Sequence, residues 1–162
     1  MNFYFSKRLP KKCYSIAILT NLLIYNGDNP VEELSEKWVF GLGSIKDRTS
    51  ITSVEEIAKK GYGCQMEGEY DDEEKVVFLE KVVNHELCHT FGMRHCIFFT
   101  CLMNGTSGYE EAAKKVEHLC PICVRKLQLA IEFDMLERYE KLGDEKSLML
   151  AEKIRQVVGE KK

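Results

Sequence analysis

Residues 85–95 read HELCHTFGMRH, and three of the chain's four histidines fall inside this one window. Two histidines four residues apart on a helix project from the same face one turn apart, so both imidazoles can reach a single metal ion. Glu86 lies about 100° around the helix from His85. That is too far for a natural third ligand but close enough to contact a water molecule at the metal. The spacing therefore predicts a metal site on His85 and His89, with Glu86 as general base.

The third ligand is predicted to be His95, and Gly92 makes this possible. In a continuous helix His95 would be rotated by about 240° from His89 and displaced by about 9 Å along the axis. Glycine adopts the left-handed conformation that turns a chain sharply at a helix end, which would bring His95 back toward the metal. Three neutral imidazoles leave zinc its double positive charge and one open position, and such sites lower the pKa of bound water to about 7.

Four of the seven cysteines form a second predicted metal site directly after the histidines. They are Cys96, Cys101, Cys120 and Cys123, the last two in a CxxC pattern. Four thiolates give zinc a closed tetrahedral shell, so such a site is structural and contributes folding free energy. Since Cys96 follows His95, ordering the cysteines would also orient His95. The alternative is that these cysteines are free or form a disulfide pair.

Composition is that of an ordinary globular protein. The chain has 162 residues, 30% of them charged, and a formal net charge of -3, so nothing indicates a nucleic-acid partner. The most apolar stretch, residues 16–25, is about half as long as a membrane-spanning helix, and the N-terminus lacks the pattern of a secretory signal. We therefore expect an intracellular, cytoplasmic protein without a membrane partner. In that compartment clustered cysteines are more often metal ligands than disulfides.

Periodicity and turn residues predict the secondary structure. Strands are expected at Cys13–Thr20, Lys37–Leu42 and Arg48–Val54, with a hairpin joining the last two. A short helix is expected at Val54–Lys60 and a loop from Lys60 to Asp72. The metal-binding helix is predicted to begin at the acidic run 71–74 and to end at Gly92. Further helices are expected at Glu110–Glu117, Pro121–Leu142 and Asp144–Val158, with Gly143 between the last two.

The run from His85 to Cys123, HELCHTFGMRHCIFFTCLMNGTSGYEEAAKKVEHLCPIC, resembles the signature of the archaemetzincins. These are metzincin-type zinc peptidases in which an HExxHxxGxxH motif precedes a four-cysteine zinc site with a methionine inside it. The resemblance implies two zinc ions: a catalytic zinc on the three histidines, with Glu86 as general base, and a structural zinc on the four cysteines. From the residues alone Met103 is a core methionine, whereas the resemblance implies that it belongs to the family's Met-turn.

The resemblance also implies an α/β fold. The expected fold is a compact metzincin-like domain in which a twisted, mixed and mostly parallel sheet is packed with helices. The active-site helix would lie below a substrate cleft, and further helices would follow toward the C-terminus. We expect one domain over residues 1–162, with residues 144–162 as a C-terminal helical extension.

The expected function is zinc-dependent hydrolysis of a peptide bond in a peptide or protein substrate, and some members of the family are aminopeptidase-like. An extended substrate would add to a sheet edge, with Arg48–Val54 as the candidate strand. The alternative is a zinc-stabilised peptide- or protein-binding module with weak or no catalysis. Glu86 argues against it, because a structural site has no use for a base. A zinc-ribbon nucleic-acid binder is disfavoured by the net acidity.

Overall fold

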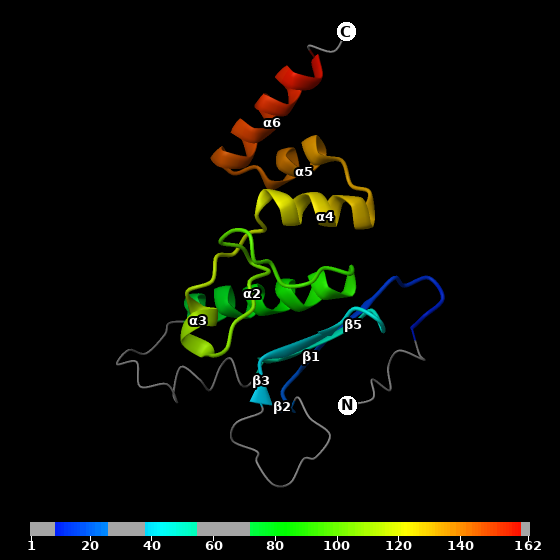
Figure 1. Ribbon diagram of the computed structural model, residues 1–162, viewed down its shortest axis with the longest axis vertical. Coiled ribbons are helices and arrows are strands. Elements are labelled where there is room, and N and C mark those ends of the chain that lie inside the picture. The colour runs from blue at the N-terminus through cyan, green and yellow to red at the C-terminus, as the bar shows by residue number, and fades with distance from the viewer. Residues whose placement is uncertain (1–8, 26–37, 55–71, 160–162) are drawn as a thin grey trace. The chain divides into compact units, whose positions relative to one another are not determined.

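A computed structural model of the protein describes residues 9–25, 38–54 and 72–159 (Figure 1). Contacts within the chain divide it into two units, Met1–Cys123 and Val124–Lys162, and each is described by itself. The division falls inside helix α4 (Pro121–Ile131). No helix among the described residues is long and apolar enough to cross a membrane.

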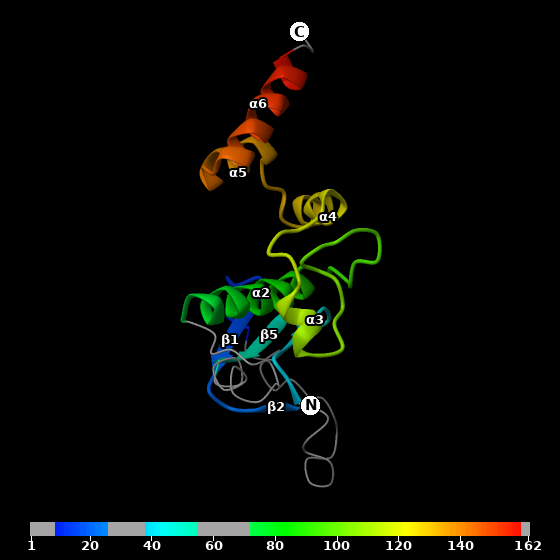
Figure 2. The same cartoon turned by 90° about the vertical axis from the view of Figure 1, so that its left-hand side faces the viewer.

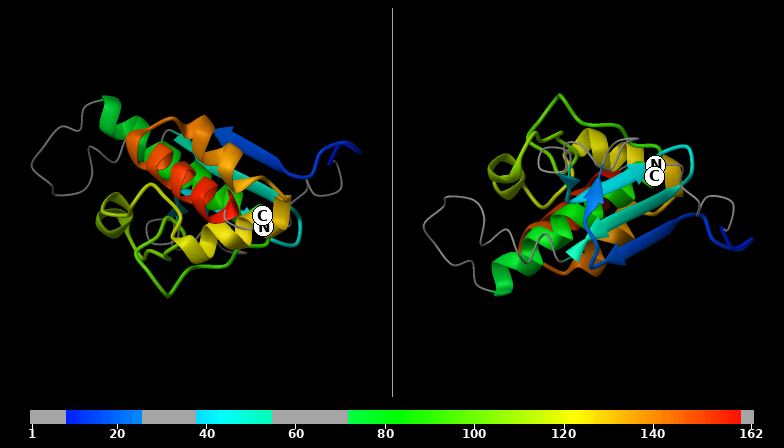
Figure 3. Two further views of the ribbon diagram at one scale, coloured as in Figure 1. Left: turned by 90° about the horizontal axis from the view of Figure 1, so that it is seen from above. Right: turned by 90° about the horizontal axis from the view of Figure 1, so that it is seen from below.

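The first unit contains a three-stranded sheet and a two-stranded sheet. Strand β5 (Thr49–Ser53) lies between β1 (Ile16–Thr20) and β4 (Gly41–Ser44) in the larger sheet. It pairs in parallel with β1 and antiparallel with β4, and the strands lie side by side along helix α2 (Figure 3). The smaller sheet is an antiparallel pair of β2 (Ile24–Tyr25) and β3 (Trp38–Val39). The expected mixed α/β fold is confirmed, but the expected predominance of parallel pairing is not.

The hairpin predicted to join the strands Lys37–Leu42 and Arg48–Val54 is confirmed, although its first strand is divided. β4 and β5 are joined by a turn in which the Asp47 amide donates to Ser44 Oγ at 3.0 Å. The predicted strand Lys37–Leu42 becomes β3 and β4, with Phe40 between them. The carbonyl of Phe40 accepts a hydrogen bond from the amide of Ser53, so this residue joins the ladder without belonging to either strand.

The prediction that Arg48–Val54 forms a sheet edge is wrong. β5 is the central strand, and Thr49, Thr52 and Ser53 are each at most 2% exposed. Its hydroxyl-rich sequence suggests a solvated edge, but the β-branched threonines suit a strand and the side chains are small enough for close packing against a helix. Among the described strands, the edge on this side of the sheet is β4.

Helix α2 (Asp72–Thr90) lies along the larger sheet (Figures 1 and 2). Its first turn carries three acidic residues, as predicted, where they complement the helix dipole. Phe78 and Val82 form the core on its buried face together with Ala112 of α3 (Tyr109–Ala113). Phe40 meets Phe78 edge to face at 5.1 Å between ring centroids. This packing fixes the helix that carries the histidines.

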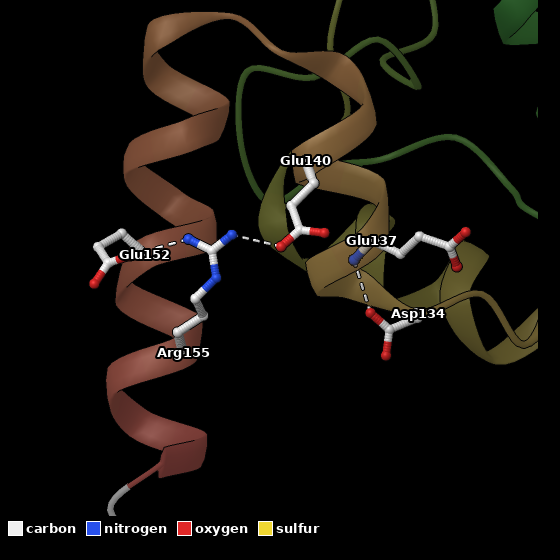
Figure 4. Close-up of polar contacts among 5 residues, drawn as sticks. All are labelled: Asp134, Glu137, Glu140, Glu152 and Arg155. Carbon is white, nitrogen blue, oxygen red and sulfur yellow. Dashed lines mark hydrogen bonds and ion pairs between the residues drawn. The ribbon is translucent and has the colours of Figure 1, made fainter.

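The second unit contains a pair of helices, α5 (Met135–Leu142) and α6 (Glu145–Gly159). The expected single helix over Pro121–Leu142 is wrong, because α4 ends at Ile131 and Glu132 has a φ of 52°. Asp134 then caps α5 by accepting the amide of Glu137 (Figure 4). The break expected at Gly143 is confirmed, since this glycine has a φ of 70° at the end of α5.

One ion pair joins the two helices of this hairpin, and a second lies within α6. Arg155 of α6 contacts Glu140 of α5 at 2.6 Å and Glu152 at 3.0 Å (Figure 4). Exposed pairs of this kind contribute little to stability, because solvent screens them. The short helix predicted at Val54–Lys60 and the loop predicted from Lys60 to Asp72 lie outside the described residues, apart from the end residues Val54 and Asp72.

Candidate metal centres

Helix α2 presents His85, Glu86 and His89 near its C-terminal end. His85 shares the buried face of the helix with Phe78 and Val82, as their spacing predicts, and is 6% exposed. His89 lies one turn further on and is half-buried. The Nε2 atoms of the two imidazoles are 3.2 Å apart. This separation allows both to bind one ion between them at the usual zinc–nitrogen distance of about 2.0–2.1 Å.

The chain reverses at Gly92 as the sequence predicts. Gly92 has a φ of 84°, its amide donates to the carbonyl of His89, and the amide of Met93 donates to the carbonyl of Cys88. These bonds satisfy carbonyl groups of the last helical turn. A residue with a Cβ atom would be strained at this φ, so the turn favours glycine.

The turn brings His95 to the other two histidines. Ring centroids of His85, His89 and His95 are 4.8–5.2 Å from one another. One nitrogen atom from each ring lies within 4.8 Å of the other two. The three side chains therefore form a cluster that can hold one metal ion, with His95 the exposed member.

Hydrogen bonds on the far side of two rings set their orientation. Nδ1 of His85 lies 2.8 Å from the carbonyl oxygen of Leu102, and Nδ1 of His89 lies 2.6 Å from that of Met93. A carbonyl only accepts, so each Nδ1 carries the proton and each Nε2 keeps its lone pair for a metal. The donor set and its tautomers fit a zinc ion.

Burial keeps these imidazoles neutral. It lowers the pKa of His85 to about 3, and the Leu102 carbonyl opposes this more weakly. Lys115, and the other two imidazoles when protonated, lower the pKa further through their charge. The pKa values of His89 and His95 are also lowered, mainly by burial. Because a metal binds the neutral imidazole, the cluster is ready to accept a metal at neutral pH.

Glu86 lies between the histidine cluster and strand β4. Burial raises the pKa of its carboxyl to about 7, while Lys115 and the amide of Gly43 lower it. A Cβ atom on Gly41 would lie 2.7 Å from Cγ of Glu86, and one on Gly43 would lie 2.7 Å from Cβ of His89. The two glycines therefore allow β4 to approach the helix closely. A carboxyl whose pKa lies near neutrality can both accept and return a proton.

The four predicted cysteines form the second cluster, and all are buried. Their sulfur atoms lie within 4.8 Å of one another, and Sγ of Cys96 is 3.8 Å from Sγ of Cys120. The thiols are free, so no disulfide joins them. The amides of Met103 and Cys120 donate to Sγ of Cys101 at 3.4 and 3.2 Å. The sulfur positions fit a tetrahedral metal site closed to solvent.

Burial raises the pKa of most thiols near this cluster. The pKa of Cys101 and that of Cys123 are raised chiefly by burial, and burial also raises that of Cys88 to about 11. Burial acts on Cys96 in the same direction, but hydrogen bonds from the backbone of Phe98 and Phe99 and from neighbouring thiols lower its pKa to about 7. A thiol that ionises near pH 7 is a ready first ligand for a metal.

One short segment, residues 101–104, supports both clusters. The carbonyl of Leu102 orients His85, and the carbonyl of Met103 accepts the amide of Cys96 at 2.7 Å. Asn104 donates to the carbonyl of Cys96 and accepts the amide of Cys101, each at 2.8 Å. Met103 is fully buried. Neither Leu102 nor Asn104 is among the residues predicted from sequence. The backbone oxygen of Leu102 has no residue-type signal, whereas the turn dipeptide Asn104-Gly105 is a signal for Asn104.

A pocket with a volume of about 680 Å³ opens beside the histidine cluster. It is lined by the three histidines and Glu86, by β4 and by the segment before and within α3. Lys115, which the sequence analysis also missed, lines it as well, and its Nζ lies 3.4 Å from Nδ1 of His85. The candidate site thus combines a metal-binding cluster, a carboxyl group and a neighbouring sheet edge in one cavity.

Comparison with known proteins finds sequence relatives over most of the chain. Archaemetzincin-2 from Pongo abelii is 32% identical over 160 residues, which covers 86% of this chain and 43% of the relative. Human archaemetzincin-1 is 47% identical over 62 residues, which covers 38% of this chain and 12% of the relative. The chain thus spans less than half the length of these curated relatives.

Two solved structures are similar in fold. An archaemetzincin from Methanopyrus kandleri matches with a TM-score of 0.56 and 24% identity over 78% of this chain and 61% of the other. A zinc-dependent peptidase from Methanocorpusculum labreanum matches with a TM-score of 0.51 and 26% identity over 70% and 53%. The model of peptidase family M54 matches residues 19–129. This match covers well over half of the chain, which therefore belongs to peptidase family M54, the archaemetzincins.

Proposed function

We propose that the chain is a zinc-dependent metallopeptidase that hydrolyses peptide bonds in the pocket beside the histidine cluster. The observation that carries this proposal is the meeting of three neutral imidazoles and the Glu86 carboxyl in one pocket. A purely structural metal site has no use for a carboxyl group beside an open position. The shared fold with a zinc-dependent peptidase supports the same reading.

His85, His89 and His95 would hold the catalytic zinc. A bound zinc ion at such a site supplies Lewis acidity toward a carbonyl group and toward water. The Nδ1 atoms of His85 and His89 donate to the carbonyls of Leu102 and Met93. These hydrogen bonds support the assignment, because they aim the two Nε2 lone pairs at one point. Gly92 and Met103 would act as supporting residues, Gly92 by reversing the chain and Met103 through its backbone contact with Cys96.

Glu86 would act as the general base and then as the general acid. It would take a proton from the attacking water molecule and deliver it to the leaving amine. Its raised pKa of about 7 supports both steps. The amide of Gly43 in β4 donates a hydrogen bond to the carboxylate. Strand β4 would therefore help to position the base.

The four cysteines would hold a second, structural zinc. Burial and four thiolate donors would leave no position for a substrate or a water molecule. Their role would be to hold residues 101–104, and through them His85 and His95. With both sites loaded, the chain would hold two zinc ions with separate tasks.

An extended substrate would pair with the edge of β4 that no described strand covers. This strand pairs with β5 on one side, and its residues line the pocket on the side of Glu86. Peptides commonly add to exposed sheet edges through backbone hydrogen bonds. Glu86 is the only carboxyl group among the described residues that line the pocket, so no second one is available there to bind a free α-amino group. This favours cleavage within a peptide over aminopeptidase-like action.

The test is cleavage of an unstructured peptide library by zinc-loaded protein, followed by mass spectrometry. The wild-type protein should cleave peptides, and His95→Ala should lose both the cleavage and one metal equivalent. His118→Ala is the matched control, because His118 is exposed and lies outside the cluster. If zinc-loaded wild-type protein binds peptides without cleaving any, the chain is a zinc-stabilised binding module instead.

A further inference from the structure

The pocket beside the histidine cluster is lined by more cations than anions. Lys81, Arg94 and Lys115 line it, and Glu86 is the only carboxyl group among the described lining residues. Neutral imidazoles do not reduce the charge of a bound metal ion, so zinc would add to this excess. A substrate therefore enters a pocket with a surplus of positive charge.

The three cations differ in how far they are already paired. Lys81 donates to the carbonyl of Ala113 at 3.3 Å and contacts Glu117 at 3.8 Å, so its charge is used within the protein. Arg94 is exposed to solvent. Lys115 is half-buried, and the carboxyl groups of Glu86 and Glu111 attract its charge without forming a direct ion pair with its Nζ.

The contact between Lys115 and His85 is not a hydrogen bond. Nδ1 of His85 donates to the carbonyl of Leu102 at 2.8 Å, so it has no lone pair for the ammonium group 3.4 Å away. Lys115 therefore has three donors at the pocket and no direct acceptor among the described residues, although the charges of Glu86 and Glu111 act on it from further away. A partly buried ammonium group is favourable only when an anion or acceptor accompanies it.

We infer that the pocket selects peptides that carry a carboxylate close to the scissile bond, and that Lys115 binds this carboxylate. The inference rests on the proposed peptidase function and names its substrate class. The carboxylate has two possible sources, an aspartate or glutamate side chain beside the scissile bond and the free C-terminus of a short peptide. A charge-assisted hydrogen bond of this kind is about twice as strong as a neutral one.

The experiment measures binding, so that it does not depend on turnover. The probes are an end-blocked hexapeptide with a central glutamate, its glutamine analogue, and the glutamine peptide with an unblocked C-terminus. Affinities are measured by calorimetry at low salt on zinc-loaded Glu86→Gln protein, which keeps all three cations. We expect one of the two carboxylate peptides to bind about 5- to 10-fold more tightly than the blocked glutamine peptide. Which of them does so identifies the source.

Variants then assign the preference to one residue. Adding Lys115→Ala should reduce the preference to less than about 2-fold, whereas Lys115→Arg should retain part of it because the charge remains. The matched control is Lys114→Ala, which removes the neighbouring exposed lysine and should leave the preference unchanged. Thermal unfolding of each variant verifies that its fold is retained.

Two results would overturn the inference. The first is equal affinity for all three peptides. The second is a preference that survives Lys115→Ala, because the carboxylate would then be bound by the metal or by Arg94. Neither depends on cleavage. Failure of the zinc-loaded wild-type protein to hydrolyse any peptide, tested separately, would instead refute the proposed peptidase function.

Discussion

The histidine cluster and the cysteine cluster lie close in the chain but differ in access to solvent. The histidines line a pocket, and His95 is exposed at its rim. The cysteines are buried, with Cys101 and Cys123 at 0% exposure. Both clusters bring their ligand atoms within 4.8 Å. The clusters differ in their number of candidate ligands and in the presence of Glu86 beside the histidines. Ligand number and access to solvent, more than the distance between ligand atoms, therefore distinguish a site suited to catalysis from one suited to a structural role.

The two clusters are mechanically linked through residues 101–104. Leu102 orients His85, while Asn104 and Met103 hold the backbone of Cys96 next to His95. Damage to the cysteine cluster should therefore spread to the histidines, whereas a change at Glu86 should remain local.

The largest effect is expected for Cys120→Ala. Removing one of four buried thiolates should release the structural metal, whose binding free energy is on the order of 10 kcal/mol in small zinc domains. We expect loss of one metal equivalent, a free energy of unfolding lower by at least about 3 kcal/mol, and weaker metal binding at the histidines. Elemental analysis and chemical denaturation measure these quantities.

Cys13→Ala is the matched control for this change, because Cys13 is an exposed free thiol outside the cluster. It should leave the metal content and the unfolding transition as in the wild type. An unchanged melting temperature in Cys120→Ala with two metals retained would remove the distinction between the clusters.

Glu86→Gln should give the second largest effect, and only on catalysis. We expect kcat to fall by about 10²- to 10⁴-fold, because the amide can neither accept nor return a proton. Both metal equivalents should remain. Steady-state kinetics and elemental analysis measure the outcome, with Glu80→Gln on an exposed position of the same helix as control. Turnover equal to that of the wild type would exclude Glu86 as the base.

The third prediction concerns pH and the protein freed of its histidine-site metal. Burial raises the pKa of Glu86 from its ordinary value of 4.5 to about 7 in the folded protein. The folded state then holds a proton that the unfolded state releases, so this group stabilises the fold at low pH and loses that contribution as pH rises through 7. Glu86→Gln has no such loss.

The variant should therefore gain stability over the wild type by about 2 kcal/mol between pH 5.5 and pH 8. Urea denaturation of both proteins at the two pH values gives this difference. The lowered pKa of His85 acts in the opposite sense, costing stability as pH falls below 6.5, but it is common to both proteins. A difference that does not change with pH would contradict the raised pKa.

The smallest effect is expected for Gly105→Ala. A Cβ atom there would lie 2.9 Å from Nδ1 of His95, so the imidazole must shift. We expect metal affinity at the histidines to fall by about 10-fold, the size typical of changes around metal ligands. The control is Gly108→Ala, where a Cβ atom would have no described neighbour within 4 Å. Competition with a metal indicator measures both affinities, and equal values would show that His95 tolerates the shift.

The two residue clusters could be predicted because their signals are local. Helical spacing places His85 and His89 on one face, and Gly92 reverses the chain because few other residues adopt its φ of 84°. The division of the expected helix at Glu132 had no comparable signal, since a positive φ at a glutamate is uncommon and depends on its surroundings. Lys115 was missed for a related reason, because a single lysine beside another in a helical segment usually points to solvent.

Residue types and spacings in the chain were enough to indicate two clusters that could each hold a metal, a carboxyl group beside one of them, and the family to which the protein belongs. Folding in three dimensions settled that β5 lies in the middle of the sheet and β4 at its edge, and that residues 101–104 and Lys115 reach His85. Coordination chemistry depends on which atoms a short stretch of chain offers. Strand order and pocket charge depend on contacts between segments far apart in the chain, and side-chain patterns do not encode these directly.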